Sequence, residues 1–184
     1  MFSGKTTELM RLSDRYRIAN KSVVHVKHSF DDRYSKDSLC SHDMKTGKGI
    51  CITTGALSNI IDRLNEYDVI AIDEGQFFED ITEACCNLAD NGKIIIVSAL
   101  NATYDRTPFL NISRLIAQAD DIIYLKAVCV KCGANASFSN LVDTANSKED
   151  PAQIVVGGTN MYRALCRECF LVEHDRRQKL HERF

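Results

Sequence analysis

The sequence has little net charge and no long hydrophobic run, and both absences narrow the class of protein. Over 184 residues the formal net charge is −2, which argues against an extended basic surface for nucleic acid. No apolar run approaches the ~20 residues of a membrane-spanning helix, and no basic–apolar leader opens the chain. We therefore expect a cytoplasmic protein that binds neither nucleic acid nor a membrane.

Cysteine, by contrast, is abundant, with eight residues in the chain. Four of them form two Cys-x-x-Cys pairs, Cys129 with Cys132 and Cys166 with Cys169, and 33 residues lie between the pairs. Four thiolates suit a tetrahedral Zn²⁺ with no open position, which is typical of a structural site. The alternatives are reduced core cysteines or a redox disulfide.

Strand-like apolar runs alternate with helix-like segments through the first two thirds of the chain. The patterns predict helices over 6–20, 57–64, 79–90 and 111–119, and strands over 22–27, 69–72, 94–100 and 122–127. Such alternation is typical of an α/β fold in which helices cover both faces of a parallel sheet. Beyond Cys129 the pattern changes, so we expect a nucleotide-binding domain over 1–128, a zinc-clipped segment over 129–170 and a charged tail over 171–184.

The chain opens with half of a phosphate-binding motif. Ser3-Gly4-Lys5-Thr6 precedes a helical pattern and matches the end of G-x-x-x-x-G-K-[ST], in which Lys contacts the outer phosphates and the hydroxyl residue binds Mg²⁺. A helix N-terminus also favours an anion. The first glycine and the apolar strand that should precede it are missing, so we expect the N-terminus to be incomplete. The alternative is a chance Gly-Lys-Thr on a surface helix.

Two carboxylates follow the apolar run 69–72. Asp73 and Glu74 should lie at the carboxyl edge of a parallel sheet, where ligands bind. An Asp there often anchors the Mg²⁺ of a phosphate loop, and a neighbouring Glu can act as a general base. Strand alternation predicts that the two side chains point in opposite directions. The alternative is a pair of solvated carboxylates.

Several other side chains are candidates for a nucleotide or nucleoside site. An aromatic ring near the sheet edge can stack a base, although each one alone is more often part of the core. Arg33 is either a phosphate ligand or a surface charge. The remaining candidates are Gln76, Phe77, Phe78, Tyr104, Phe109 and Tyr162.

Five motifs together resemble the cytosolic-type (type II) thymidine kinase family. They are Met-Phe-Ser-Gly-Lys-Thr-Thr-Glu-Leu, Asp-Asp-Arg-Tyr, Ile-Asp-Glu-Gly-Gln-Phe-Phe, Thr-Tyr-Asp-Arg-Thr-Pro-Phe, and Gly-Gly-Thr-Asn-Met-Tyr between the cysteine pairs. The match runs from Met1 to about Phe170. It implies a P-loop parallel sheet with a small zinc-binding lasso domain, a homotetramer, and ATP-dependent phosphorylation of the thymidine 5′-hydroxyl, with deoxyuridine as a second candidate substrate.

The resemblance also implies roles for individual residues. Glu74 would be the catalytic base, Asp73 the Mg²⁺ partner, and the four paired cysteines the Zn²⁺ ligands. The implied ATP and Mg²⁺ contacts are Met1, Phe2, Ser3, Gly4, Lys5, Thr6, Asp31, Asp32, Arg33, Asp73, Glu74, Gly75 and Gln76. The implied nucleoside contacts are Tyr104, Gln153, Ile154, Val155, Val156, Gly157 and Tyr162. The rival functions are a P-loop ATPase without a nucleoside acceptor and a zinc-ribbon protein that binds nucleic acid.

Overall fold

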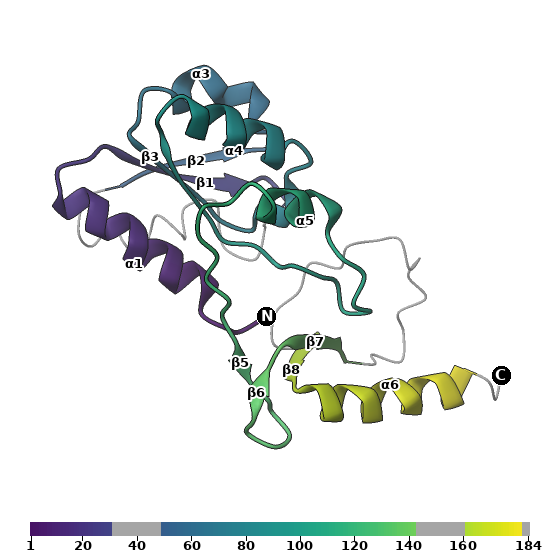
Figure 1. Ribbon diagram of the computed structural model, residues 1–184. Coiled ribbons are helices and arrows are strands. Elements are labelled where there is room, and N and C mark those ends of the chain that lie inside the picture. The colour runs from purple at the N-terminus through teal and green to yellow at the C-terminus, as the bar shows by residue number, and fades with distance from the viewer. Residues whose placement is uncertain (31–48, 143–160, 182–184) are drawn as a thin grey trace. The chain divides into compact units, whose positions relative to one another are not determined.

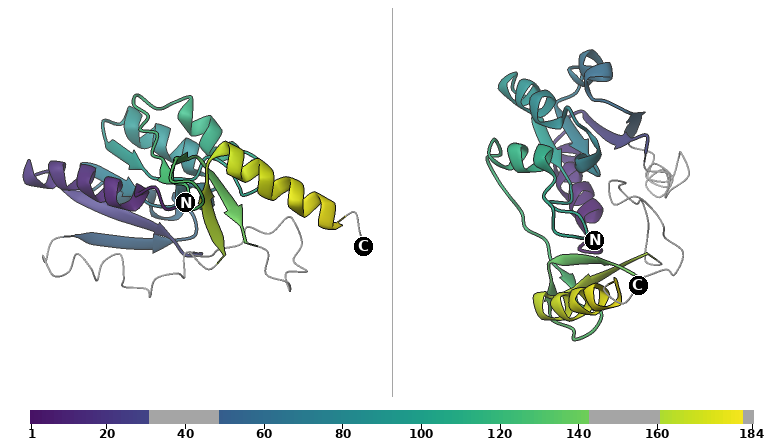
Figure 2. Two further views of the ribbon diagram at one scale, coloured as in Figure 1. Left: turned by 90° about the horizontal axis from the view of Figure 1, so that it is seen from below. Right: turned by 90° about the vertical axis from the view of Figure 1, so that its right-hand side faces the viewer.

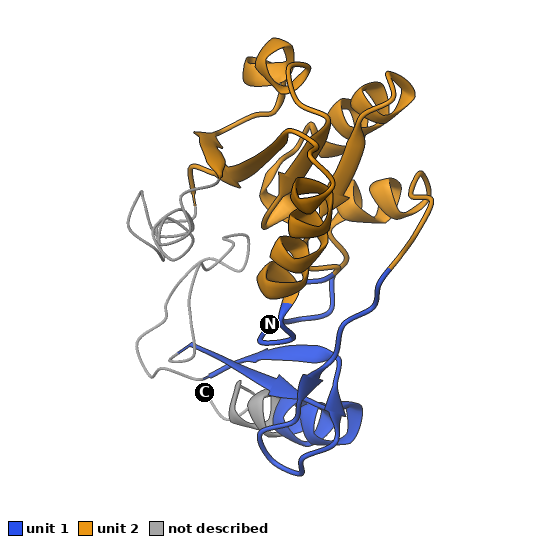
Figure 3. Ribbon diagram, turned by 90° about the vertical axis from the view of Figure 1, so that its left-hand side faces the viewer, with its two compact units in different colours: residues 1–4, 102–107, 123–184 blue, residues 5–101, 108–122 orange. Residues whose placement is uncertain are grey.

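The computed structural model describes residues 1–30, 49–142 and 161–181. The chain divides into two compact units, which Figure 3 colours separately. The sheet unit (unit 2 in Figure 3) consists of residues 5–101 and 108–122. The cysteine unit (unit 1 in Figure 3) consists of residues 1–4, 102–107 and 123–184.

A four-stranded parallel sheet forms the centre of the sheet unit (Figure 1). Its strands are β1 (Val23–His28), β2 (Ile50–Thr54), β3 (Val69–Ile72) and β4 (Ile94–Val97), in the spatial order β2-β1-β3-β4. All four residues of β3 are buried, as expected for a central strand covered on both faces. The predicted parallel sheet is thus confirmed.

Helices cover both faces of this sheet (Figures 1 and 2). Helix α1 (Lys5–Ile18) packs on one face and α4 (Ile81–Asp90) on the other. The remaining helical elements of the unit are η2 (Ser58–Ile60), α3 (Ile61–Leu64), η3 (Gly75–Phe77) and α5 (Leu110–Ile116). The predicted helices are therefore present, with ends that differ from the sequence-based ranges by a few residues.

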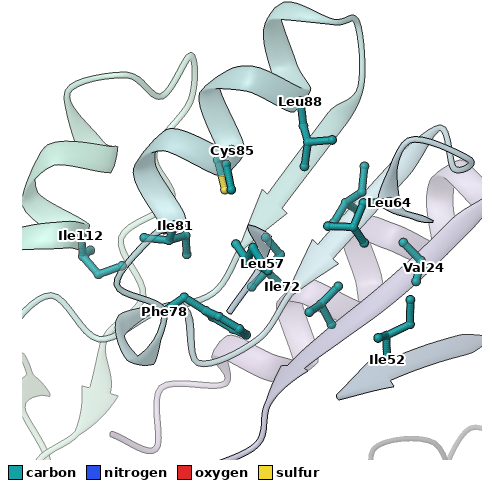
Figure 4. Close-up of a cluster of buried hydrophobic side chains, with 13 residues drawn as sticks. Val24, Ile52, Leu57, Leu64, Ile72, Phe78, Ile81, Cys85, Leu88 and Ile112 are labelled. Carbon is teal, nitrogen blue, oxygen red and sulfur yellow. The ribbon is translucent and has the colours of Figure 1, made fainter. Parts of the chain in front are cut away.

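The main core lies between the sheet and α4 (Figure 4). Alternate strand residues, among them Val24 and Ile72, point to this face and meet Ile81 and Leu88 of α4. Phe78 is completely buried in the same cluster. Of the two roles open to Phe78, a core residue or a base-stacking ring, the structure supports the core.

The strand order creates a switch point between β1 and β3. The chain leaves β1 for β2 on one side and leaves β3 for β4 on the other, so the two connections diverge. Ligands of open α/β sheets bind in the crevice outside the carboxyl ends of such a strand pair. His28 ends β1 there, and Asp73 follows β3. The topology therefore indicates a ligand site at the carboxyl end of β3, where the sequence analysis also expected one.

Short antiparallel pairs and one helix make up the described part of the cysteine unit. Strands β5 (Ala127–Val128) and β6 (Asn135–Ala136) form one pair, and β7 (Phe138–Leu141) and β8 (Tyr162–Leu165) form the other. Helix α6 spans Arg167–His181. A small core gathers around Leu165 and Phe170, which are 0% and 2% exposed.

One prediction about this second part of the chain was wrong. The strand expected over 122–127 does not form, and Ile122, Ile123 and Tyr124 are all more than half exposed. A strand needs a hydrogen-bonded neighbour. The partner found here is a nearby segment of the chain, so that Ala127 begins a short antiparallel pair with Ala136. The charged tail predicted over 171–184 is helical as far as His181.

No helix within the described ranges combines the length and the apolar character that crossing a bilayer requires.

We predict that Leu88→Ala destabilises the protein by about 2–5 kcal/mol, because Leu88 is fully buried between α4 and the sheet and its loss leaves a cavity. Urea denaturation measures the change. Leu110→Ala is the matched control, since Leu110 is 65% exposed and should change stability by less than about 0.5 kcal/mol. Equal effects of the two substitutions would contradict this description of the core.

Candidate active site

Asp73 is a buried carboxylate that accepts three described hydrogen bonds. It follows β3 directly and is 5% exposed. Its Oδ1 accepts the Ser98 hydroxyl and the Glu74 N–H, the latter at 3.0 Å, and its Oδ2 accepts the Thr6 hydroxyl at 2.8 Å. Burial raises the pKa of Asp73, while the bonds from Ser98 and Thr6 act in the opposite direction. These donors favour the ionised form that a cation site needs.

The Thr6 contact joins the first turn of α1 to the end of β3. Lys5 is the first residue of this 14-residue helix. The free N–H groups of the first turn and the helix dipole make this end electropositive. Just before it, the backbone takes left-handed conformations at Phe2 (φ 61°) and Gly4 (φ 81°). The sheet unit thus holds a hydroxyl and a carboxylate together at the start of a helix.

Glu74 lies in a strained turn and is held by Gln76. The backbone of Glu74 is left-handed (φ 50°, ψ 46°), which is uncommon for a residue other than glycine and is often found at functional sites. The Gln76 amide donates to Glu74 Oε2 at 2.6 Å. Because β3 ends at Ile72, strand alternation does not set the directions of Asp73 and Glu74. The turn sets them instead.

Gln76 is in turn fixed by the elements around it. The side chain is 4% exposed, and its Oε1 accepts the N–H of Leu100 at 2.9 Å. Asn111, near the start of α5, donates its amide to the carbonyl oxygens of Gln76 (3.1 Å) and Phe78 (2.8 Å). The turn that carries Glu74 is therefore held both by the segment that follows β4 and by α5.

Gly75 allows this turn to approach β4 closely. Its N–H donates to the Ser98 carbonyl at 2.9 Å. A Cβ at this position would lie 2.7 Å from both Ile81 Cδ1 and Val97 Cγ1, closer than real Cβ contacts. Glycine is required here by space, since no left-handed backbone is involved.

Three polar residues near this site were missed by the sequence analysis: Ser98, Asn111 and His28. Ser98 follows the apolar strand β4, which is the same signal that identified Asp73, so that signal would have found it. His28 ends β1, and its ring lies against those of Phe77 and Phe78, with centroids 5.8 and 4.7 Å apart. His28 Nδ1 accepts the Phe30 N–H (3.0 Å), so Nε2 carries the proton donated to the Gly55 carbonyl (3.0 Å). Nothing in the local sequence marks Asn111.

The four paired cysteines come together in the cysteine unit. Their Sγ atoms all lie within 4.8 Å of one another, with 3.6 Å between those of Cys132 and Cys166. Tetrahedral Zn–S bonds of about 2.3 Å place sulfurs about 3.8 Å apart, so the cluster is of the right size for zinc. The alternative of a disulfide does not apply to these four cysteines, because each is a free thiol. The alternative of core cysteines does not fit either, because the four form one compact cluster and Cys132 is exposed.

The ionisation of the cluster also suits a cation. Backbone N–H groups, chiefly that of Cys166, lower the pKa of Cys129 to about 6. The neighbouring Cys166 thiol raises the pKa of Cys169 to about 12. One thiolate therefore forms readily, whereas a further thiolate forms with difficulty because the negative charges repel each other. A bound dication would relieve this repulsion.

Tyr104 and Tyr162, the two aromatic candidates for nucleoside contact, also belong to the cysteine unit. Tyr104 is half-buried in a tight turn closed by the Thr103 N–H, which donates to the Thr107 carbonyl at 2.9 Å. Arg106 of this turn lies over the Phe170 ring, 5.2 Å from its centroid. Tyr162 begins β8 opposite Leu141 and is 7% exposed.

The remaining predicted contacts lie outside the described residues. These are Asp31, Asp32 and Arg33, and the segment Gln153, Ile154, Val155, Val156 and Gly157. They stay predictions.

Comparison with known proteins identifies the family of this chain. The sequence profile of the family described as thymidine kinase matches residues 1–170. The thymidine kinase of raccoon poxvirus is 44% identical over 173 residues, covering 94% of this chain and 93% of the relative. Those of monkeypox virus and of vaccinia virus strain Western Reserve are each 42% identical over 171 residues, covering 93% of this chain and 92% of the relative. The chain belongs to the thymidine kinase family, whose members phosphorylate a nucleoside.

We predict that Gly75→Ala destabilises the protein by about 1–3 kcal/mol, because the added methyl group is overpacked against Ile81 and Val97. Urea denaturation measures this. Gly55→Ala is the control, since a Cβ there meets Ser29 Oγ at an ordinary 3.4 Å. If both variants were as stable as the parent, the close approach of the Glu74 turn to β4 would be disproved.

Proposed function

We propose that this chain transfers the terminal phosphoryl group of ATP to the 5′-hydroxyl of thymidine, giving dTMP and ADP. The observation that carries the proposal is the 2.8 Å contact between Thr6 Oγ and Asp73 Oδ2, with Glu74 next in the chain. It supports a site in which oxygen ligands of the kind that Mg²⁺ prefers meet the start of a helix. Membership of the thymidine kinase family supports a nucleoside as the acceptor of the phosphoryl group.

On the nucleotide side, Lys5 and the first N–H groups of α1 would bind the phosphates. Thr6 and Asp73 would hold Mg²⁺, because a hydroxyl and a carboxyl oxygen are already in contact there. The bound ion would offset the charge that develops on the phosphates during transfer. Met1, Phe2, Ser3 and Gly4 would add backbone contacts to the phosphates.

On the acceptor side, Glu74 would accept the proton of the sugar hydroxyl. Gln76 holds Glu74 Oε2 and is itself fixed by Leu100, so the carboxylate loses little freedom when a substrate arrives. Such preorganisation is what an acid–base group needs to act.

For nucleoside binding, Tyr104 would stack on the thymine ring and Tyr162 would contact the deoxyribose. Backbone groups of Gln153–Gly157 would read the base edge, and a fixed donor–acceptor pair leaves a mismatched base unpaired. Arg33 would contact the phosphates. These assignments follow from the family resemblance, as does the homotetramer. The homotetramer and the cytoplasmic location stay predictions.

We also propose that Cys129, Cys132, Cys166 and Cys169 hold a structural zinc ion. Its support is the size of the sulfur cluster and the mutual effect of the thiols on their pKa values. The ion would join β5, the turn after it and α6, in a unit whose apolar core is small.

The test of the function is formation of dTMP from ATP and thymidine, followed by chromatography, with ATP consumption measured with and without thymidine. We expect both products only when thymidine and Mg²⁺ are present. Thymidine-independent hydrolysis would favour a P-loop ATPase, and salt-sensitive oligonucleotide binding without nucleoside affinity would favour a nucleic-acid-binding protein. Either result overturns the proposal.

In the same assay, Glu74→Gln should lower kcat about 10²–10⁴-fold, the usual contribution of a positioned acid–base group. ATP binding, measured by calorimetry, should change little. Glu79→Gln is the matched control, because Glu79 is an exposed carboxylate five residues further on. Near-normal turnover of Glu74→Gln would remove Glu74 from the catalytic role.

Zinc analysis of the purified protein should find one ion per chain. Chelation should raise the KM for thymidine before it lowers the melting temperature of the sheet unit, because the ligands all lie in the other unit. Cys132→Ser should lose zinc, whereas Cys86→Ser, a half-buried cysteine outside the cluster, should keep it. Active protein free of zinc would contradict the assignment.

A further inference from the structure

Ser98 follows β4 and contacts the buried carboxylate of Asp73. Its hydroxyl donates to Asp73 Oδ1, and the residue is 8% exposed. Its backbone is fixed as well, since its N–H donates to the Ile72 carbonyl and its carbonyl accepts the Gly75 N–H, each at 2.9 Å. The backbone of Ser98 is therefore bonded to Ile72, before Asp73, and to Gly75, after it.

The donors divide between the two oxygens of Asp73 in a way that fixes the carboxylate. Oδ1 accepts two of them, the Ser98 hydroxyl and the Glu74 N–H. Oδ2 accepts the Thr6 hydroxyl at the start of α1. Rotation of the carboxylate would break both bonds to Oδ1 inside a buried site, where an unsatisfied polar atom is costly. The plane of the carboxylate is therefore fixed, and one of its two oxygens faces Thr6.

We propose that Ser98 is a positioning residue for metal binding, because it holds Asp73 in the orientation that presents Oδ2 beside the Thr6 hydroxyl. This inference rests on the proposed function, in which Thr6 and Asp73 bind Mg²⁺. Ser98 itself acts only through Asp73, since its hydroxyl proton is used on Oδ1. Outer-shell groups that orient a metal ligand commonly change metal affinity by about 10–100-fold.

The experiment measures binding of Mn²⁺–ADP by electron paramagnetic resonance, without turnover, together with the Mg²⁺ dependence of kcat. Ser98→Ala should weaken Mn²⁺–ADP binding about tenfold and raise the Mg²⁺ concentration for half-maximal rate by a similar factor. Ser98→Thr keeps the hydroxyl and should restore both. The KM for thymidine should stay within about twofold, because metal orientation and nucleoside binding use different groups.

Ser13→Ala is the matched control, because Ser13 is a completely buried serine of α1 whose hydroxyl donates to the Met10 carbonyl at 3.0 Å. Circular dichroism of each variant establishes that it is folded. A folded Ser98→Ala variant that binds Mn²⁺–ADP as tightly as the parent would overturn the role of Ser98. If the parent itself bound no Mn²⁺–ADP, the proposed function would fail instead, so the two failures are distinguishable.

Discussion

The sheet unit depends on one buried carboxylate. Asp73 is 5% exposed and yet lies where three elements end or begin, with donors from Thr6 of α1, Glu74 after β3 and Ser98 after β4. A buried charge is costly unless it is hydrogen-bonded. The three donors lower that cost. Their bonds also hold the start of α1 and the end of β4 next to the end of β3. The position of Glu74 follows from the same arrangement, because its N–H is one of the donors.

A second constraint acts on the turn behind Asp73. Gly75 touches α4 and β4 so closely that any side chain would collide, while Gln76 and Asn111 connect the turn to the N–H of Leu100 and to α5. The left-handed backbone of Glu74 is uncommon for a non-glycine residue, and this surrounding network maintains it. A site built in this way is rigid before a ligand arrives, which suits the proton transfer proposed for Glu74.

The cysteine unit is organised differently. Its strands are two to four residues long, and its described core is a small cluster around Leu165 and Phe170. Short two-stranded pairs are only marginally stable alone. The contact between the Cys132 and Cys166 sulfurs and that of the Arg106 guanidinium with the Phe170 ring add connections to this small core. The turn that carries Tyr104 is linked to α6 by the same contact.

By itself, the sequence predicted three of the four strands of the sheet and the pairing of the four cysteines, and it marked Asp73 and Glu74 as candidate site residues, because hydrophobic periodicity and short motifs are local properties. It did not predict β2. It failed at 122–127, where an apolar run has the composition of a strand and lacks a strand partner. Only the tertiary structure decided that the Ser98 hydroxyl contacts Asp73, that Asn111 holds the turn after β3, and that this turn is left-handed at Glu74. Contacts between residues distant in the chain depend on how strands are ordered and how closely they approach, and no local pattern encodes that.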